Sequence, residues 1–173
     1  MRRMGARARD ARGQSTVEAA VALPVVFLLV LLLVQPGIVL YDRMVMQGAA
    51  AEGCRLLATK TAAQGDMDGS CEAFVRHRLG AVPPHDCFHV HRGGCSWDIV
   101  LAGDEGSQTV SVTVGTDVCP LPLLDAGAAL LGMTDAAGNL HLETTVSLPA
   151  QPAWVDGAEA GRDPAGWIGA WLR

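Results

Sequence analysis

The chain has 173 residues, half of them hydrophobic, and a formal net charge of −5. This length leaves room for one membrane segment and one small domain of about 100–120 residues. Residues 1–13 hold five arginines and one aspartate, a net charge of +4, so the rest of the chain carries −9. Because phosphates are bound by clustered cations and the acidic body has one lysine, Lys60, we expect no nucleic acid as partner.

A long apolar run follows the basic leader, residues 1–13. From Ala19 to Leu40 the only polar side chain is Gln35, and 22 residues at about 1.5 Å each span about 33 Å, close to the thickness of a bilayer core. We therefore predict a single transmembrane helix over residues 14–40 in the cytoplasmic membrane. The arginines before it place the N-terminus inside and the C-terminal domain outside. A cleaved secretory signal is the rival prediction, but the run is longer than its usual apolar region and no small-x-small cleavage site follows.

Glu18 stands at the edge of this apolar run. A carboxylate buried there costs roughly 2.5–3.5 kcal/mol, so it needs a compensating partner. A cut between Gly13 and Gln14 would create a new α-amine and make Glu18 the fifth residue of the mature chain. That ammonium, on the same or a neighbouring chain, could pair with the carboxylate. The alternative is a glutamate that only snorkels to the membrane surface.

The hexapeptide Gly13-Gln14-Ser15-Thr16-Val17-Glu18, between an arginine-rich leader and a membrane helix, resembles the type IV prepilin cleavage motif. The wider stretch from Gly13 to Thr59, with "GQSTVEAAVALPVVF" and "YDRMVMQGAAAEGCRLLAT", resembles the TadE-type pseudopilins of tight-adherence (Flp) pilus systems. The resemblance implies that a prepilin peptidase cleaves after Gly13 and that Glu18 registers each subunit by contacting a neighbour's N-terminal amine. It further implies other pilin or pseudopilin subunits, the pilus assembly platform and membrane lipid as partners. It leaves open whether the chain ends in a cell-surface pilus, at its tip, or stays in the membrane as an assembly factor.

The next segment, residues 41–63, predicts an amphipathic stem helix. Its apolar residues share one helical stripe whose middle is small, so another element can approach closely; they are Val45, Met46, Ala49, Ala50, Gly53, Leu56 and Leu57. Pro24 and the Gln35-Pro36-Gly37 step would each remove a backbone hydrogen bond. They leave open whether one straight helix runs from Ser15 to Thr61.

Residues 64–150 predict an α+β head. Asp68 or Ser70 could cap a short helix that ends at Leu79, with apolar residues at helical spacing: Cys71, Phe74, Val75 and Leu79. Three strands are expected at 97–102, 107–115 and 142–149. In the second strand three valines alternate with polar residues, and "GDEG" before it signals a hairpin. A short helix and loop should separate the second and third strands, giving a small antiparallel sheet of about three strands.

The tail, residues 151–173, is rich in Gly, Ala, Pro and Trp. Its first half reads as a flexible linker. Its second half could form one apolar turn that docks on the head, on a partner or on the membrane surface, made by Trp167, Ile168, Trp171 and Leu172. We favour docking on the head.

Five cysteines follow the membrane segment and therefore lie outside the cytoplasm, where disulfides persist: Cys54, Cys71, Cys87, Cys95 and Cys119. Two bridges and one odd thiol allow about 15 arrangements. We favour Cys54 with Cys71, which ties the stem to the next helix, and Cys87 with Cys95, which closes a small loop.

The stretch "HDCFHVHRGGC" is the one candidate metal site, because alternating zinc-type ligands would share one face of an extended strand: His85, Cys87, His89 and His91. The spacing matches no common zinc signature, so exposed loop histidines are the preferred interpretation. No nucleophile, phosphate-binding or metalloprotease motif is present, so we predict no enzyme activity and no cofactor.

The predicted function is that of a pilin-like structural or assembly subunit of a tight-adherence pilus or related secretion filament. The alternative is an uncleaved, signal-anchored extracytoplasmic binding protein with a disulfide-stabilised head.

Overall fold

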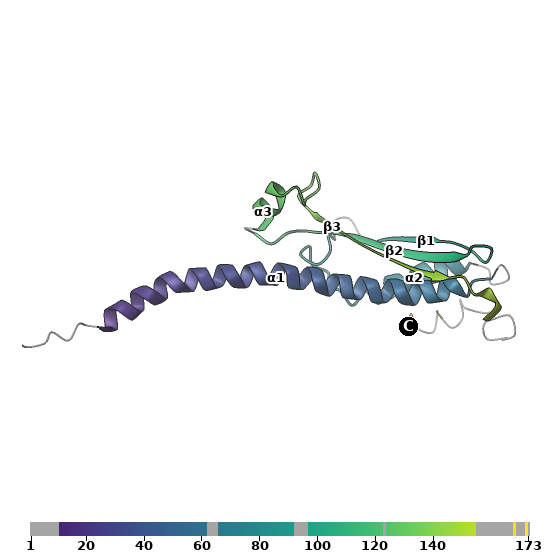
Figure 1. The fold of residues 1–173 in the computed structure, drawn as a ribbon, viewed down its shortest axis with the longest axis horizontal. Helices are drawn as coiled ribbons and strands as arrows, with labels where there is room; N and C mark the ends of the chain where they lie inside the picture. Colours follow the sequence, from purple (N-terminus) through teal and green to yellow (C-terminus); the bar gives the residue numbers. More distant parts are fainter. Residues whose placement is uncertain are drawn as a thin grey trace, which may run out of the picture.

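The computed structural model describes residues 11–61, 66–91, 97–122 and 124–154 together with Ile168 and Leu172, with side chains from Ser15 onward. A long helix, α1 (Ala11–Ala58), carries a small head at its C-terminal end. The head consists of a shorter helix, α2 (Met67–Leu79), and a three-stranded antiparallel sheet that lies along α1 (Figure 1). The predicted α+β fold, a long apolar helix followed by a small head, is confirmed.

Helix α1 is continuous across both of its prolines, Pro24 and Pro36. Figure 1 shows a gentle curve and no break, so the lost hydrogen bonds do not divide the helix. From Ser15 to Val34 nearly every side chain is exposed, and the head begins to cover α1 at Gln35. The helix is long and apolar enough to cross a membrane.

The strands are β1 (Asp98–Ala102), β2 (Thr109–Val118) and β3 (Leu140–Pro149), with β2 in the middle. All three predicted strands are confirmed; β2 runs three residues further and β3 begins two residues earlier than expected. In the register, Val112 of β2 lies opposite Leu101 of β1 and Val146 of β3. The alternation in β2 buries one row of side chains against the helices: Val110, Val112, Val114, Thr116 and Val118.

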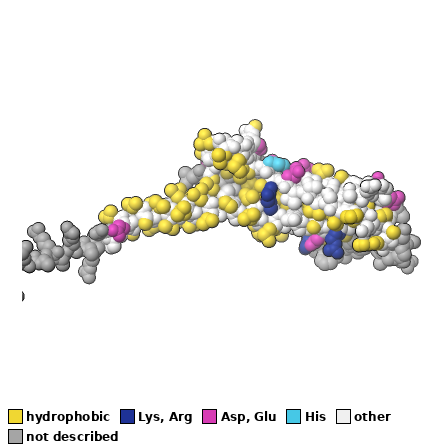
Figure 2. All heavy atoms as spheres, in the orientation of Figure 1, with side chains coloured by type: hydrophobic (Ala, Val, Ile, Leu, Met, Phe, Trp, Pro, Cys, Tyr) yellow, Lys and Arg dark blue, Asp and Glu magenta, His cyan; other side chains and the backbone are white. Residues whose placement is uncertain are grey.

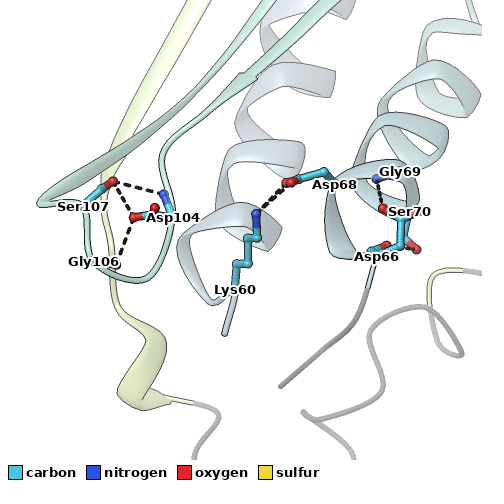
Figure 3. Close-up of polar contacts among 8 residues, drawn as sticks. All are labelled: Lys60, Asp66, Asp68, Gly69, Ser70, Asp104, Gly106 and Ser107. Atoms are coloured by element: carbon cyan, nitrogen blue, oxygen red, sulfur yellow. Dashed lines mark hydrogen bonds and ion pairs between the residues drawn. The ribbon is translucent and has the colours of Figure 1, made fainter. Parts of the chain in front are cut away.

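The predicted hairpin joins β1 to β2. Gly103 has a φ of +104°, and a Cβ there would lie 2.8 Å from the Thr109 carbonyl oxygen, so the turn requires glycine. The Asp104 carboxylate closes the turn by accepting hydrogen bonds from the Gly106 amide at 3.0 Å and the Ser107 hydroxyl at 2.8 Å (Figure 3). These contacts lower the pKa of Asp104, the Ser107 hydroxyl having the largest effect.

The N-cap of α2 differs from the prediction. Asp66, rather than Asp68 or Ser70, caps the helix by accepting a hydrogen bond from the Gly69 amide at 3.0 Å. Asp68 instead pairs with Lys60 at the end of α1, at 2.8 Å between Nζ and Oδ2 (Figure 3). The helix therefore starts at Met67, one residue before the first predicted cap, because the Asp66 carboxylate satisfies an amide of its first turn.

The main core lies where α1, α2 and the sheet meet. Both helices supply small or branched side chains to it, which permits close contact with β2; the fully buried members of the two helices include Met46, Ala50, Cys54, Cys71, Val75 and Leu79. The predicted apolar positions of the stem stripe face this core, and so do those of α2 except Phe74.

A second cluster joins Met67 and Phe74 to Ile168, with Leu56 and Leu172 packed against it. Ile168 is 1% exposed, so the end of the tail docks on the head at this residue, as predicted. Trp167 and Trp171 lie outside the described residues. The chain also forms a short helix, α3 (Leu124–Leu130), between β2 and β3, as expected, and a 3₁₀ helix at Pro152–Trp154.

Candidate processing and assembly site

The predicted cleavage point lies in the first turn of α1. The helix starts at Ala11, so the peptide bond between Gly13 and Gln14 is close to its end, and Glu18 follows one turn after Gln14. Residues four apart share one helical face, about one 5.4 Å pitch from each other. An amine created at Gln14 would therefore lie on the same face as the Glu18 carboxylate.

Glu18 sits on a part of α1 that no other described segment covers. Its side chain is exposed, as are the apolar neighbours Val17, at 65%, and Val21, at 67%. A surface of this kind is stable only in lipid or against other apolar helices. Glu18 therefore lies on the surface of α1 that lipid or another apolar helix would cover.

The stretch from Glu52 to Arg55 holds the head to α1. Glu52 pairs with Arg78 of α2, and Cys54 is buried in the core. A Cβ on Gly53 would overlap the Cγ2 atom of Val75, so only glycine lets α2 approach this closely. The close contact with Val75 explains why the small-residue stripe has a glycine at position 53.

A buried carboxylate, Asp42, was missed in the sequence. It is 0% exposed, and neither carboxylate oxygen has a hydrogen-bond partner among the described residues. Asp42 lies one helical turn before Met46, on the same buried stripe of α1. This spacing was the feature of the sequence from which its burial could have been predicted. Two turns earlier on the same face, Gln35 accepts a hydrogen bond from the Leu121 amide at 2.8 Å through Oε1.

Cys54 and Cys71 lie close together in the core, both as free thiols. Cys71 Sγ is 3.3 Å from the carbonyl oxygen of Gly53, the residue directly before Cys54. Burial raises the pKa of the Cys71 thiol to about 12. The two cysteines are neighbours in the structure, as the predicted bridge requires. The bridge itself stays a prediction.

Non-reducing peptide mapping of protein taken from the membrane tests this pair. We expect one linked peptide containing Cys54 and Cys71, since both side chains reach the same small volume of the core. Alkylation of both thiols after denaturation without reductant would contradict the bridge. Cys71→Ser alone should then leave Cys54 as a free thiol that reacts only when the chain is unfolded.

Cys87 and Cys119 are half-buried free thiols in the structure, and Cys95 lies outside the described residues. The Cys119 amide donates a hydrogen bond to the carbonyl of Asp86 at 2.7 Å. This contact brings Cys119 close to Cys87, the residue after Asp86. The predicted bridge from Cys87 to Cys95 stays a prediction, and the same mapping distinguishes it from one to Cys119.

The histidine-rich segment differs from the sequence interpretation in two ways. It forms turns rather than a strand, because the amides of Phe88 and His89 both donate to the His85 carbonyl. His89 is also buried, at 3% exposure, and its ring stacks on Trp97 with centroids 4.8 Å apart. Of the four candidate ligands, His89 and His91 come together, at 3.2 Å between ring nitrogens. Within the described ranges, no three metal-binding side chains gather.

The buried ring predicts a pH effect on stability. Burial lowers the pKa of His89, and the neighbouring His91 lowers it further, while Asp86 opposes the shift. A lowered folded-state pKa means that the unfolded chain binds the proton more readily. Stability from the neutral ring is therefore present above about pH 6.5 and is lost as the pH falls through the folded pKa.

We expect His89→Phe, which keeps a ring against Trp97, to flatten the fall in thermal midpoint between pH 7.5 and 5 in detergent. His141→Gln is the matched control. The hydrogen bond that the His141 ring donates to the Asp117 carboxylate raises the pKa of His141. This exposed pair therefore adds a little stability at low pH, and its loss should steepen the fall slightly. An unchanged pH profile for His89→Phe would contradict the prediction.

A groove of about 800 Å³ is bordered by three elements: the C-terminal end of α1, helix α2 and the end of β3. Its lining is mostly apolar and includes Leu56, Phe74, Leu148 and Trp154. Leu56 and Phe74 also contact Leu172 and Ile168, so the groove adjoins the surface on which the tail docks.

One part of the chain is similar to a known protein family. The family model described as TadE-like protein matches residues 13–55, which begin at Gly13 and end within the Glu52–Arg55 run. Searches of the curated proteins and of the solved structures find no match. Over residues 13–55, from the predicted cleavage glycine to the contact between stem and head, the chain is similar to TadE-like proteins.

Proposed function

We propose that this chain is a pilin-like structural or assembly subunit of a tight-adherence pilus or a related secretion filament. The TadE-like match carries the proposal, because it starts at Gly13 and covers the bare apolar half of α1 together with the part that binds the head. A prepilin peptidase cuts after Gly13, and the other partners are pilin or pseudopilin subunits and the assembly platform. The role is structural, and the one reaction assigned is the cleavage of this chain.

The bare half of α1 serves two environments. Before assembly, Ser15–Val34, a run of about 30 Å, spans the membrane with the arginine leader inside and the head outside. In the filament the same apolar surface packs against helices of neighbouring subunits. No rearrangement of the head is required, since the head covers α1 only from Gln35 onward.

Glu18 sets the register between subunits. Its carboxylate stands on the uncovered face, and cleavage supplies each subunit with an α-amine at Gln14. In an apolar bundle the two charges are stable only as a pair, so a new subunit stops where its amine meets a carboxylate already in place.

The cleavage is tested by Gly13→Leu with Gly5→Leu as its matched control. Both changes add the same side chain to the leader. We expect Gly13→Leu to keep the 13-residue leader in the intact mass and Gly5→Leu to lose it. Normal processing of Gly13→Leu would contradict cleavage at this glycine. Retention of the leader by the unchanged chain would favour an uncleaved signal-anchored binding protein.

A further inference from the structure

The segment after β2 presents apolar side chains that the head does not bury. This α3 lobe, residues 124–133, contains helix α3 and the turn that follows it, and none of the described residues of α3 is buried. Leu130 is 88% exposed, Leu131 76% and Met133 61%. Leu130 and Leu131 are more exposed than Leu33 on the bare part of α1, at 73%, and Met133 is about as exposed as Phe27 there, at 62%.

The α3 lobe lies where the bare part of α1 ends. Leu121, three residues before α3, donates its amide to Gln35, the residue at which the head begins to cover α1. Figure 1 shows α3 displaced from the sheet toward the N-terminal half of α1, and Figure 2 shows hydrophobic side chains on this lobe and along that half of the helix. With Ser15–Val34 in a bilayer core of about 30 Å, the lobe stands at its outer surface.

The charges of this region exclude an electrostatic anchor. Between Cys119 and Leu140 the only charged residues are Asp125 and Asp135. Both carboxylates bind nearby backbone: Asp125 accepts from the Ala126 amide at 2.7 Å, and Asp135 accepts from the amides of Ala137 and Asn139 at 2.8 Å. The surface is therefore suited to apolar contact and has no cation for anionic lipid.

We propose that the α3 lobe is a second membrane contact, with Leu130, Leu131 and Met133 inserted at the boundary between headgroups and acyl chains of the outer leaflet. It holds the head against the bilayer. Lipid is favoured over a second copy because the lobe continues the apolar surface of α1 at the level of the membrane surface. The inference depends on the proposed membrane span of α1 and on neither cleavage nor assembly.

Photo-crosslinking of the full chain in phosphatidylcholine vesicles tests the contact. Benzoylphenylalanine replaces one residue at a time: Leu131 in the lobe, Leu29 on the bare part of α1, or Val100 on the edge strand β1. Leu29 is 55% and Val100 51% exposed, so each control is open to a neighbour. After illumination, we expect the mass of one phospholipid to be added at Leu131 and Leu29 and not at Val100.

Each other outcome has one meaning. Lipid at Leu29 without lipid at Leu131 overturns the inference and leaves the membrane span intact. A crosslink from Leu131 to a second copy of the chain overturns it in favour of a subunit interface. Absence of lipid at Leu29 overturns the membrane span and the inference with it. Lipid at Val100 as well as Leu131 shows unspecific contact and also overturns the inference.

Discussion

Glu18→Gln is expected to remove the subunit from sheared surface filaments while cleavage after Gly13 continues. The amide keeps the size of the side chain and removes its charge. In an apolar bundle the α-amine of the neighbouring subunit then has no counter-ion, and breaking one partner of a buried charge pair costs about 3–5 kcal/mol. Since about 1.4 kcal/mol is a tenfold change in an equilibrium constant, incorporation should fall by more than about a hundredfold.

Immunoblotting of the filament and membrane fractions measures this effect, and the intact mass reports processing separately. Glu18→Asp keeps the charge on a shorter side chain and should retain part of the incorporation. Leu29→Ala, on the same bare surface, changes volume without changing charge and should assemble. Normal incorporation of Glu18→Gln would show that the carboxylate has no role in register.

Gly53→Leu has the largest expected effect on stability. Helix α2 approaches α1 so closely that a Cβ at position 53 would overlap Val75 Cγ2, and Val112 of β2 lies 3.8 Å from that same point. Val75 is fully buried, and its branched side chain has few alternative rotamers. Overpacking of this kind costs about 1–3 kcal/mol, occasionally more, so the thermal midpoint should fall by roughly 3–10 °C.

Gly48 provides the matched control, because it lies in the same helix with nothing within 4 Å of a Cβ. Gly48→Leu should leave the midpoint unchanged or raise it, since glycine is a poor helix former. A double variant tests the cause directly: Gly53→Ala combined with Val75→Ala should be less destabilised than the sum of the two single changes. Strict additivity would mean that the two residues do not compete for the same space.

Local patterns in the sequence were enough to predict the elements of the fold. The alternating valines of β2, the Gly103 turn and the apolar spacing of α2 all appear where they were expected. The prolines of α1 were the open question, and the helix passes through both because two missing hydrogen bonds do not outweigh the remaining ones.

What the sequence could not predict depends on contacts between distant segments. Asp68 was a plausible cap, yet Lys60 attracts it and Asp66 caps the helix instead. His89 was expected in an exposed loop, yet Trp97 supplies a ring on which it is buried. The clash that fixes Gly53 is with Val75, a partner 22 residues away that helical periodicity cannot identify.

The most direct test of the proposed function is the intact mass and N-terminal sequence of the membrane-extracted chain, from cells with and without the prepilin peptidase. The account predicts a chain that begins at Gln14 only when the peptidase is present, and one that keeps all 13 leader residues in its absence. A chain that starts at Met1 or Arg2 in both strains would contradict it.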